Sequence, residues 1–208
     1  MAIVTMPATL PCGRGCRIEQ ITTDAVSVSD PAGNSQARSY GVPRWALSLV
    51  SPATLNDAGA GAWKALLLGL RGSVNYLAAY DPSRPVPRGT LRGTLTLLAD
   101  AAYGDNSLTL DCGLAQSGKT LAAGDWLQLG TGLGSSQLVL CVADAIVDGS
   151  GHLGLSFEAP LRLALPAATP VAWDHPVGYF RRPAGRAGWA PYSGLHTQGM
   201  SIDLVEAW

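Results

Sequence analysis

The chain has 208 residues, a length that suits one large domain or two small ones with enough apolar sequence to build a core. Charged residues make up only 14%, against about a quarter in an average soluble domain, and the formal net charge is −1. This balance gives no support for contact with nucleic acid or with an anionic membrane surface. It suits a protein whose surface is partly covered by other subunits, because the cores of interfaces are depleted in charge.

Neither a membrane span nor a secretion signal is visible. No apolar run reaches the length of about 18 residues that a spanning helix needs, so we expect no membrane insertion. The N-terminal stretch MAIVTMPATLPCGRGCRIEQ lacks a basic start followed by a long apolar core, so we expect no signal peptide. An intracellular chain of this kind keeps its cysteines reduced.

Short alternating apolar runs dominate the N-terminal part and predict half-buried strands. The run RIEQITTDAVSVSD alternates and ends in a turn signal at residues 30–33. The run PRWALSLVS follows and places Trp45, Leu47 and Leu49 on one face.

One helix is predicted, over about residues 54–71, within TLNDAGAGAWKALLLGLRG. Its apolar residues recur at three- and four-residue steps and form one stripe: Leu55, Ala62, Trp63, Leu66, Leu67 and Leu70. Thr54 and Asn56 are the candidate caps of its start, while Arg71 and Gly72 suit its end. A helix with one apolar stripe needs a sheet to lie on.

The segment NYLAAYDPSRPVPRG is extended and rich in turn signals, and we interpret it as a domain boundary. Six short runs then recur at the spacing of a small sandwich or barrel: TLRGTLTLLAD, NSLTLDC, DWLQLG, SQLVLCVADAIVD, GHLGLSFEAP and TPVAWDHP. A last strand is predicted in GMSIDLVEAW. The sequence therefore predicts a mainly β fold. Residues 1–90 and 178–208 form a β-sandwich with one α-helix, interrupted by an inserted small β-sandwich or barrel of residues 91–177.

The stretch GLAQSGKT satisfies the phosphate-loop pattern G-x-x-x-x-G-K-[ST] through Gly113, Gly118, Lys119 and Thr120. A phosphate loop needs a helix directly after it, because the amides at the start of that helix hold the phosphates. Only three residues separate Thr120 from the turn signal Gly124-Asp125, less than one helical turn of about 3.6 residues. We therefore predict a turn between strands and interpret the match as coincidental, with no bound cofactor.

The cysteines do not suggest a metal site. Cys12 and Cys16 form one close pair, but a tetrahedral zinc site needs a second pair, and Cys112 and Cys141 lie far apart. The histidines are scattered, at His152, His175 and His196. Buried or idle thiols are the simpler interpretation, and a Cys12–Cys16 disulfide stays open.

Two further kinds of site leave no clear signature in the sequence. A hydrolase could use a carboxylate pair among Asp100, Asp105, Asp111, Asp125, Asp144 and Asp148. A sugar site could be lined by tryptophans from the set Trp45, Trp63, Trp126, Trp173, Trp189 and Trp208. Core or interface anchors are the simpler interpretation of the tryptophans.

Several pieces of the chain, in order, match one pattern. The first pieces are Trp45, Leu70-Arg71-Gly72, Tyr76, Asp81-Pro82 and Pro87-Arg88-Gly89. The later pieces are Gly124-Asp125, Gly149 to Gly151, Pro160-Leu161-Arg162, Phe180-Arg181 and the terminal MSIDLVEAW. Together they resemble the distal tail proteins of long-tailed bacteriophages, over most of the chain.

The resemblance implies a structural protein without catalytic residues. Distal tail proteins assemble as rings, often hexamers, at the tip of the tail tube, and they join the tube to the hub, tape-measure and host-recognition proteins. We therefore expect a homo-oligomeric virion protein, assembled in the bacterial cytoplasm, that is not an enzyme. The alternatives are another tail component (tube, collar or completion protein) or a β module that binds a glycan or the host surface.

Overall fold

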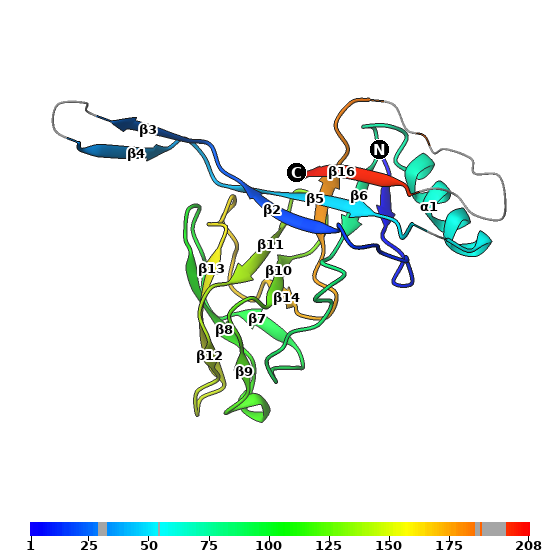
Figure 1. Ribbon diagram of the computed structural model, residues 1–208. Helices are drawn as coiled ribbons and strands as arrows, with labels where there is room; N and C mark the ends of the chain where they lie inside the picture. Colours follow the sequence, from blue (N-terminus) through cyan, green and yellow to red (C-terminus); the bar gives the residue numbers. More distant parts are fainter. Residues whose placement is uncertain (29–32, 54, 186–187, 189–198) are drawn as a thin grey trace.

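The protein combines an open sheet and a closed barrel (Figure 1), in a computed structural model that describes residues 1–208 apart from 29–32, 54, 186–187 and 189–198. The mixed sheet has, in spatial order, β1 (Ile3–Thr5), β6 (Tyr76–Ala79), β15 (Gly178–Arg181), β16 (Ser201–Glu206), β5 (Arg44–Val50) and β2 (Arg17–Ile21). The antiparallel barrel has β10 (Trp126–Gly130), β11 (Ser136–Cys141), β13 (His152–Glu158), β8 (Ser107–Asp111), β7 (Leu95–Leu97) and β14 (Pro170–Ala172). The predicted mainly β fold with one helix and an inserted small β barrel is confirmed.

The sheet is built from both halves of the chain. Strand β5 buries Trp45, Leu47 and Leu49 and leaves the alternate positions half-buried, as the period of two predicted. Strand β6 comes from the segment interpreted only as an extended boundary. All four of its residues are buried, so the sequence carries no alternation there. Strand β1 pairs with β6 in parallel, and the other pairings in this sheet are antiparallel.

Helix α1 (Asp57–Gly69) is shorter than the predicted 54–71 because its caps lie inside that range. The side chain of Asn56 accepts a hydrogen bond of 2.8 Å from the amide of Gly59, which fixes the start. Thr54, the other candidate cap, lies outside the described residues. At the other end Arg71 and Gly72 leave the helix with φ of 46° and 68°. The side-chain amide of Asn75 then donates a hydrogen bond to the backbone carbonyl of Gly69 at 2.8 Å.

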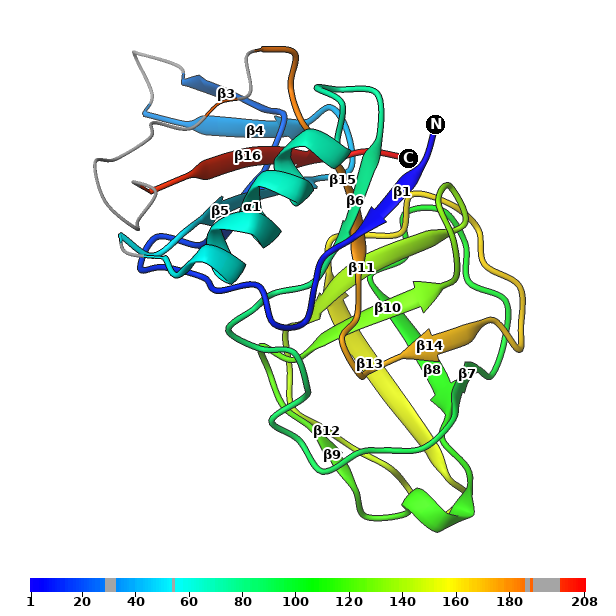
Figure 2. The ribbon, with the colours of Figure 1, turned by 90° about the vertical axis from the view of Figure 1, so that its right-hand side faces the viewer.

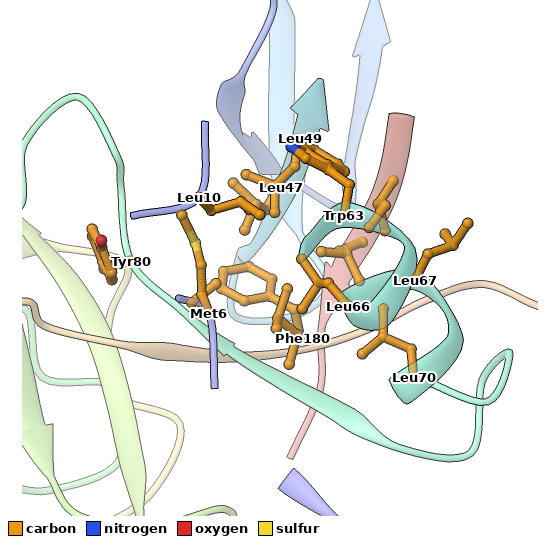
Figure 3. Close-up of a cluster of buried hydrophobic side chains, with 14 of the residues drawn as sticks. Met6, Leu10, Leu47, Leu49, Trp63, Leu66, Leu67, Leu70, Tyr80 and Phe180 are labelled. Carbon is orange, nitrogen blue, oxygen red and sulfur yellow. The ribbon is translucent and has the colours of Figure 1, made fainter. Parts of the chain in front are cut away.

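The helix lies across one face of the sheet (Figure 2), and its apolar stripe meets the inward side chains of the strands. Figure 3 shows this core, which contains Trp63, Leu66 and Leu67 of α1, its C-cap Leu70, Leu47 and Leu49 of β5, Phe180 of β15, and Met6 and Leu10 of the N-terminal segment. Trp63 is fully buried, and its indole N–H donates to the carbonyl of Pro11 at 2.9 Å. That hydrogen bond ties the N-terminal segment to the helix.

The barrel encloses a packed interior of side chains. Each of the six predicted runs contains one barrel strand, and closure leaves no unpaired edge in this part. The interior is filled by Leu95, Leu97, Leu110, Leu127, Leu129, Val139, Leu153, Leu155, Phe157 and Val171. Strands β10 and β11 are buried on both faces, because their outer side chains Trp126 and Leu138 belong to the core of the sheet.

Three small elements complete the fold. The pair β9 (Thr120–Leu121) and β12 (Ala145–Ile146) and the short 3-10 helix η1 (Leu114–Gln116) accompany the barrel. Strands β3 (Asp24–Val28) and β4 (Ser35–Ser39) form a hairpin, which we call the arm, that projects away from both sheet and barrel (Figure 1). Every residue of these two strands is exposed. No helix among the described residues is long and apolar enough to cross a membrane.

Candidate functional site

Several of the pieces that carry the resemblance meet at the joint between sheet and barrel. At its centre lies Asp125, which is 0% exposed. Its carboxylate accepts hydrogen bonds from the backbone amides of Arg88 at 2.7 Å, Gly89 at 3.0 Å and Ala122 at 2.8 Å. Asp125 thus holds the segment through which the chain enters the barrel.

Only glycine fits at position 89, because the neighbouring backbone leaves no room for a side chain. A Cβ atom on Gly89 would lie 2.2 Å from the carbonyl oxygen of Thr120 and 2.7 Å from the Cα of Leu121. Both neighbours are backbone atoms of β9, which cannot swing aside. Arg88 adds a hydrogen bond of 3.0 Å from its guanidinium to the carbonyl of Ala123. The Pro-Arg-Gly and Gly-Asp pieces, far apart in sequence, are therefore joined by hydrogen bonds in the folded protein.

Two tryptophans form the second contact of the joint. Trp45 on β5 and Trp126 on β10 meet edge to face with their ring centroids 4.9 Å apart. The indole N–H of Trp45 donates to the carbonyl of Leu138 at 3.0 Å, and that of Trp126 donates to the carboxylate of Asp81 at 3.1 Å. Both tryptophans anchor the interface between the sheet and the barrel. Asp81 of the Asp-Pro piece supplies the hydrogen-bond acceptor for Trp126.

A buried ion pair is the third contact. The guanidinium of Arg162, in the barrel segment between β13 and β14, lies 2.6 Å from the carboxylate of Glu206 on β16, and their side chains are 6% and 1% exposed. Glu206 also accepts the backbone amide of Trp45 at 3.0 Å. Burial raises the pKa of Glu206, and the charge of Arg162 opposes that shift. Removing either partner would leave the other charge buried without compensation.

Glu206 was missed by the sequence analysis, although a signal was present. The apolar residues Met200, Ile202 and Leu204 alternate along the last predicted strand. In the structure the buried face continues from Ile202 and Leu204 to Glu206. A carboxylate at the inward position of an alternating strand indicates a buried partner.

The nucleotide-motif residues lie in a turn of the barrel. No α-helix follows Thr120, which begins strand β9, and Lys119 is exposed. The amides are occupied: Gly113 donates to Asp111, Gly118 to Val147, Lys119 to Gln116 and Thr120 to the hydroxyl of Thr90. These amides point to internal acceptors, so they do not form a phosphate cradle.

The other residues of chemical interest are dispersed. Among the described residues, no three His, Cys, Asp or Glu side chains gather as metal ligands, and His196 and Trp189 lie outside that part of the chain. Burial raises the pKa of Cys112 to about 11 and that of Cys141 to about 12. Each of the six candidate aspartates accepts a backbone amide hydrogen bond: Asp100, Asp105, Asp111, Asp125, Asp144 and Asp148. Asp105, Asp111 and Asp148 close local turns, whereas Asp100, Asp125 and Asp144 bind amides that are distant in sequence.

A groove lies where the base of the arm, the barrel and the last strand meet. Its volume is about 660 Å³, and its lining includes Tyr40, Arg44, Tyr103, Arg162 and Trp208. The guanidinium of Arg44 lies 4.7 Å from the centre of the Trp208 ring, and that of Arg162 lies 4.1 Å from it. Only tertiary structure brings these residues together, so no sequence motif could have marked the groove.

A scan against protein-family models found no match, and a search of curated proteins found no similar sequence. The resemblance to distal tail proteins therefore depends on the sequence pieces alone.

We predict that Asp125→Ala lowers the free energy of unfolding by about 3 kcal/mol, because amides of the barrel entry lose a charged acceptor. The measurement is urea denaturation followed by tryptophan fluorescence. Asp144→Ala is the matched control, because Asp144 is exposed and accepts only the amide of Ala123. Equal effects of the two substitutions would contradict the central role of Asp125.

We predict that Lys119→Ala changes the free energy of unfolding by less than about 0.5 kcal/mol, as expected for an exposed turn residue. Isothermal titration calorimetry with ATP and magnesium should give no binding heat for the wild-type protein or for the Lys119→Ala variant. Micromolar ATP binding that Lys119→Ala abolishes would contradict the interpretation of GLAQSGKT as coincidental.

Proposed function

We propose that the protein is a structural subunit that assembles with copies of itself into a ring in the tail tip of a long-tailed bacteriophage. In that role it would join the tail tube to the hub, tape-measure or host-recognition proteins and would catalyse no reaction. The order of the matching sequence pieces supports the family, and the arm supports the assembly.

The arm is the observation that carries this proposal. Its pairing places Val26 opposite Ala37 and Val28 opposite Ser35, so Val26, Val28 and Ala37 share one face. Both valines are 64% exposed. A two-stranded hairpin alone is at best marginally stable in water, and an apolar face left open marks an interaction surface. The arm therefore requires a partner surface beyond its own chain.

A second copy of the chain is the partner that we propose. The sheet ends in two different strands, β1 and β2, and neither has a second neighbour among the described residues. An arm that docks on a different surface of its neighbour makes a head-to-tail contact, and such contacts close into a ring when the rotation permits. The low charge of the chain fits extensive subunit contacts.

The joint supports a mechanical role. Two contacts fix the barrel to the sheet, the Trp45–Trp126 pair and the Arg162–Glu206 pair, and the Asp125 hydrogen bonds fix the segment that enters the barrel. A subunit that must place its barrel at a defined position in a ring needs such a rigid attachment. This differs from the mobile junctions expected when an interface within a chain is small and polar.

We predict that the wild-type protein is a closed oligomer by light scattering and that Val26→Glu with Val28→Glu gives the 21.5 kDa monomer. The two charges would be buried in the contact with the neighbouring copy, at a cost that the contact cannot offset. The far-ultraviolet circular dichroism spectrum of the monomeric variant should match that of the wild type, because the arm lies outside both cores and the fold of each subunit is kept.

The matched control is Ala25→Glu with Ser27→Glu, which adds the same charge to the opposite face of the same strand. It should stay oligomeric, since its new carboxylate at position 25 faces Arg38. A wild-type protein that is monomeric throughout a dilution series would contradict self-assembly through the arm. Loss of the oligomer in both variants would contradict the assignment of the contact to the valine face.

A second candidate function, binding of a glycan on the host surface, is favoured by the groove. Aromatic and charged side chains line it, and its volume lies in the range of small-molecule sites. If this candidate holds, titration with bacterial surface oligosaccharides should give a saturable change in tryptophan fluorescence. Tyr103→Ala should then weaken binding about tenfold, a loss of about 1.4 kcal/mol, and the exposed Leu114→Ala, outside the groove, should not. No change with any oligosaccharide would contradict this candidate.

A further inference from the structure

The cysteine pair of the N-terminal segment forms a compact turn. Cys12 and Cys16 are both half-buried, and the carbonyl of Gly13 accepts the amide of Cys16 at 3.5 Å. Both cysteines line one cavity of about 280 Å³, together with Arg14 and Arg17. The thiols therefore share an opening to solvent with two cationic side chains.

Both thiols line the same cavity. Burial, and after it the neighbouring Cys16, raises the pKa of Cys12 to about 12. The sulfur of Cys16 in turn accepts the amide of Val50 at 3.2 Å and donates to its carbonyl at 3.4 Å. These contacts orient Cys16 beside Cys12.

The backbone of the turn is held in place on both sides. The amide of Gly13 donates to the carbonyl of Val50 at 2.7 Å, and the carbonyl of Pro11 accepts the indole N–H of Trp63 at 2.9 Å. A Cβ on Gly13 would lie 2.6 Å from the carbonyl oxygen of Ser51. Thiols on a turn fixed in this way stay close to each other in the folded protein.

From this geometry we propose that Cys12 and Cys16 form an oxidisable dithiol, a modification site at which a low-molecular-weight disulfide such as oxidised glutathione forms an intramolecular disulfide. The proposal depends on the thiols alone and stands whether or not the chain forms a ring. In a reducing cytoplasm the pair stays as two thiols, and it is oxidised when the folded protein meets an oxidising solution.

The exchange proceeds in two steps. One thiol of the pair loses its proton to solvent, and its thiolate attacks a sulfur of oxidised glutathione. The S–S bond of the reagent breaks, a mixed disulfide forms and one glutathione thiolate leaves. The second protein thiol, after losing its proton, attacks the protein sulfur of the mixed disulfide and releases the second glutathione. Two protein thiols are oxidised and one disulfide is reduced to two glutathione thiols.

The other two cysteines provide an internal comparison. Cys112 and Cys141 are 5% and 1% exposed in the barrel, and neither lines the cavity of the pair. An oxidant in solution therefore reaches the Cys12–Cys16 turn first, and selectivity for this pair over the two barrel cysteines tests the proposal within one molecule.

The experiment treats the native full-length protein with oxidised glutathione, denatures it, blocks the remaining thiols with iodoacetamide and measures intact and peptide masses. Before blocking, the intact mass should fall by about 2 Da, the mass of two hydrogen atoms. Trypsin cleaves after Arg14 and Arg17, so the disulfide should link the peptide of residues 1–14 to that of residues 15–17. Cys112 and Cys141 should carry the block. Dithiothreitol should restore the starting mass.

Cys16→Ser is the matched variant, because its hydroxyl can still contact Val50. It should gain one glutathione on Cys12 and lose no hydrogen pair. If this variant does not fold, Cys12→Ser provides the same test with the adduct on Cys16. The proposal is overturned if the wild-type protein keeps four blockable thiols, or if it ends as a stable glutathione adduct, since either result shows that the two sulfurs do not meet.

Discussion

The structure depends above all on one buried carboxylate. Asp125 is fully shielded from solvent and accepts three backbone amides, two of them from the segment that leads into the barrel. A carboxylate is stable in such a place only when its acceptor positions are filled. The barrel entry must therefore pass at one fixed point, where the close approach of Gly89 to the backbone of β9 leaves room for no side chain.

The rest of the joint follows from this attachment. Once the barrel is fixed, Trp126 and Leu138 on its outer face complete the core of the sheet, and Arg162 reaches Glu206 on the last strand. The barrel was inserted between the two halves of the sheet in sequence, yet it contributes side chains to the sheet's own core. A rigid subunit with a projecting apolar arm is the form expected of an assembly component, and this supports the proposed ring.

The N-terminal segment shows a second use of local geometry. Its turn at Cys12–Cys16 is held against β5 and α1, which keeps both thiols on one cavity while the barrel cysteines are enclosed. The fold therefore separates a pair of accessible cysteines from two cysteines that pack inside the barrel.

The sequence by itself determined the helix, the strands β5 and β16 and the six strands of the inserted barrel, because periods of two and of three to four residues report which face is buried. It also determined that GLAQSGKT precedes no helix. The sequence pattern did not predict strand β6, whose residues are buried on both faces of the sheet. It also did not predict that the charged residue Glu206 lies on the buried face of β16. Only the tertiary structure decided that Pro87-Arg88-Gly89 and Gly124-Asp125 are joined by hydrogen bonds. It also decided that the strand carrying Val26 and Val28 belongs to an exposed arm and not to the core. Those outcomes depend on contacts between distant segments, and local periodicity carries no information about which distant segments meet.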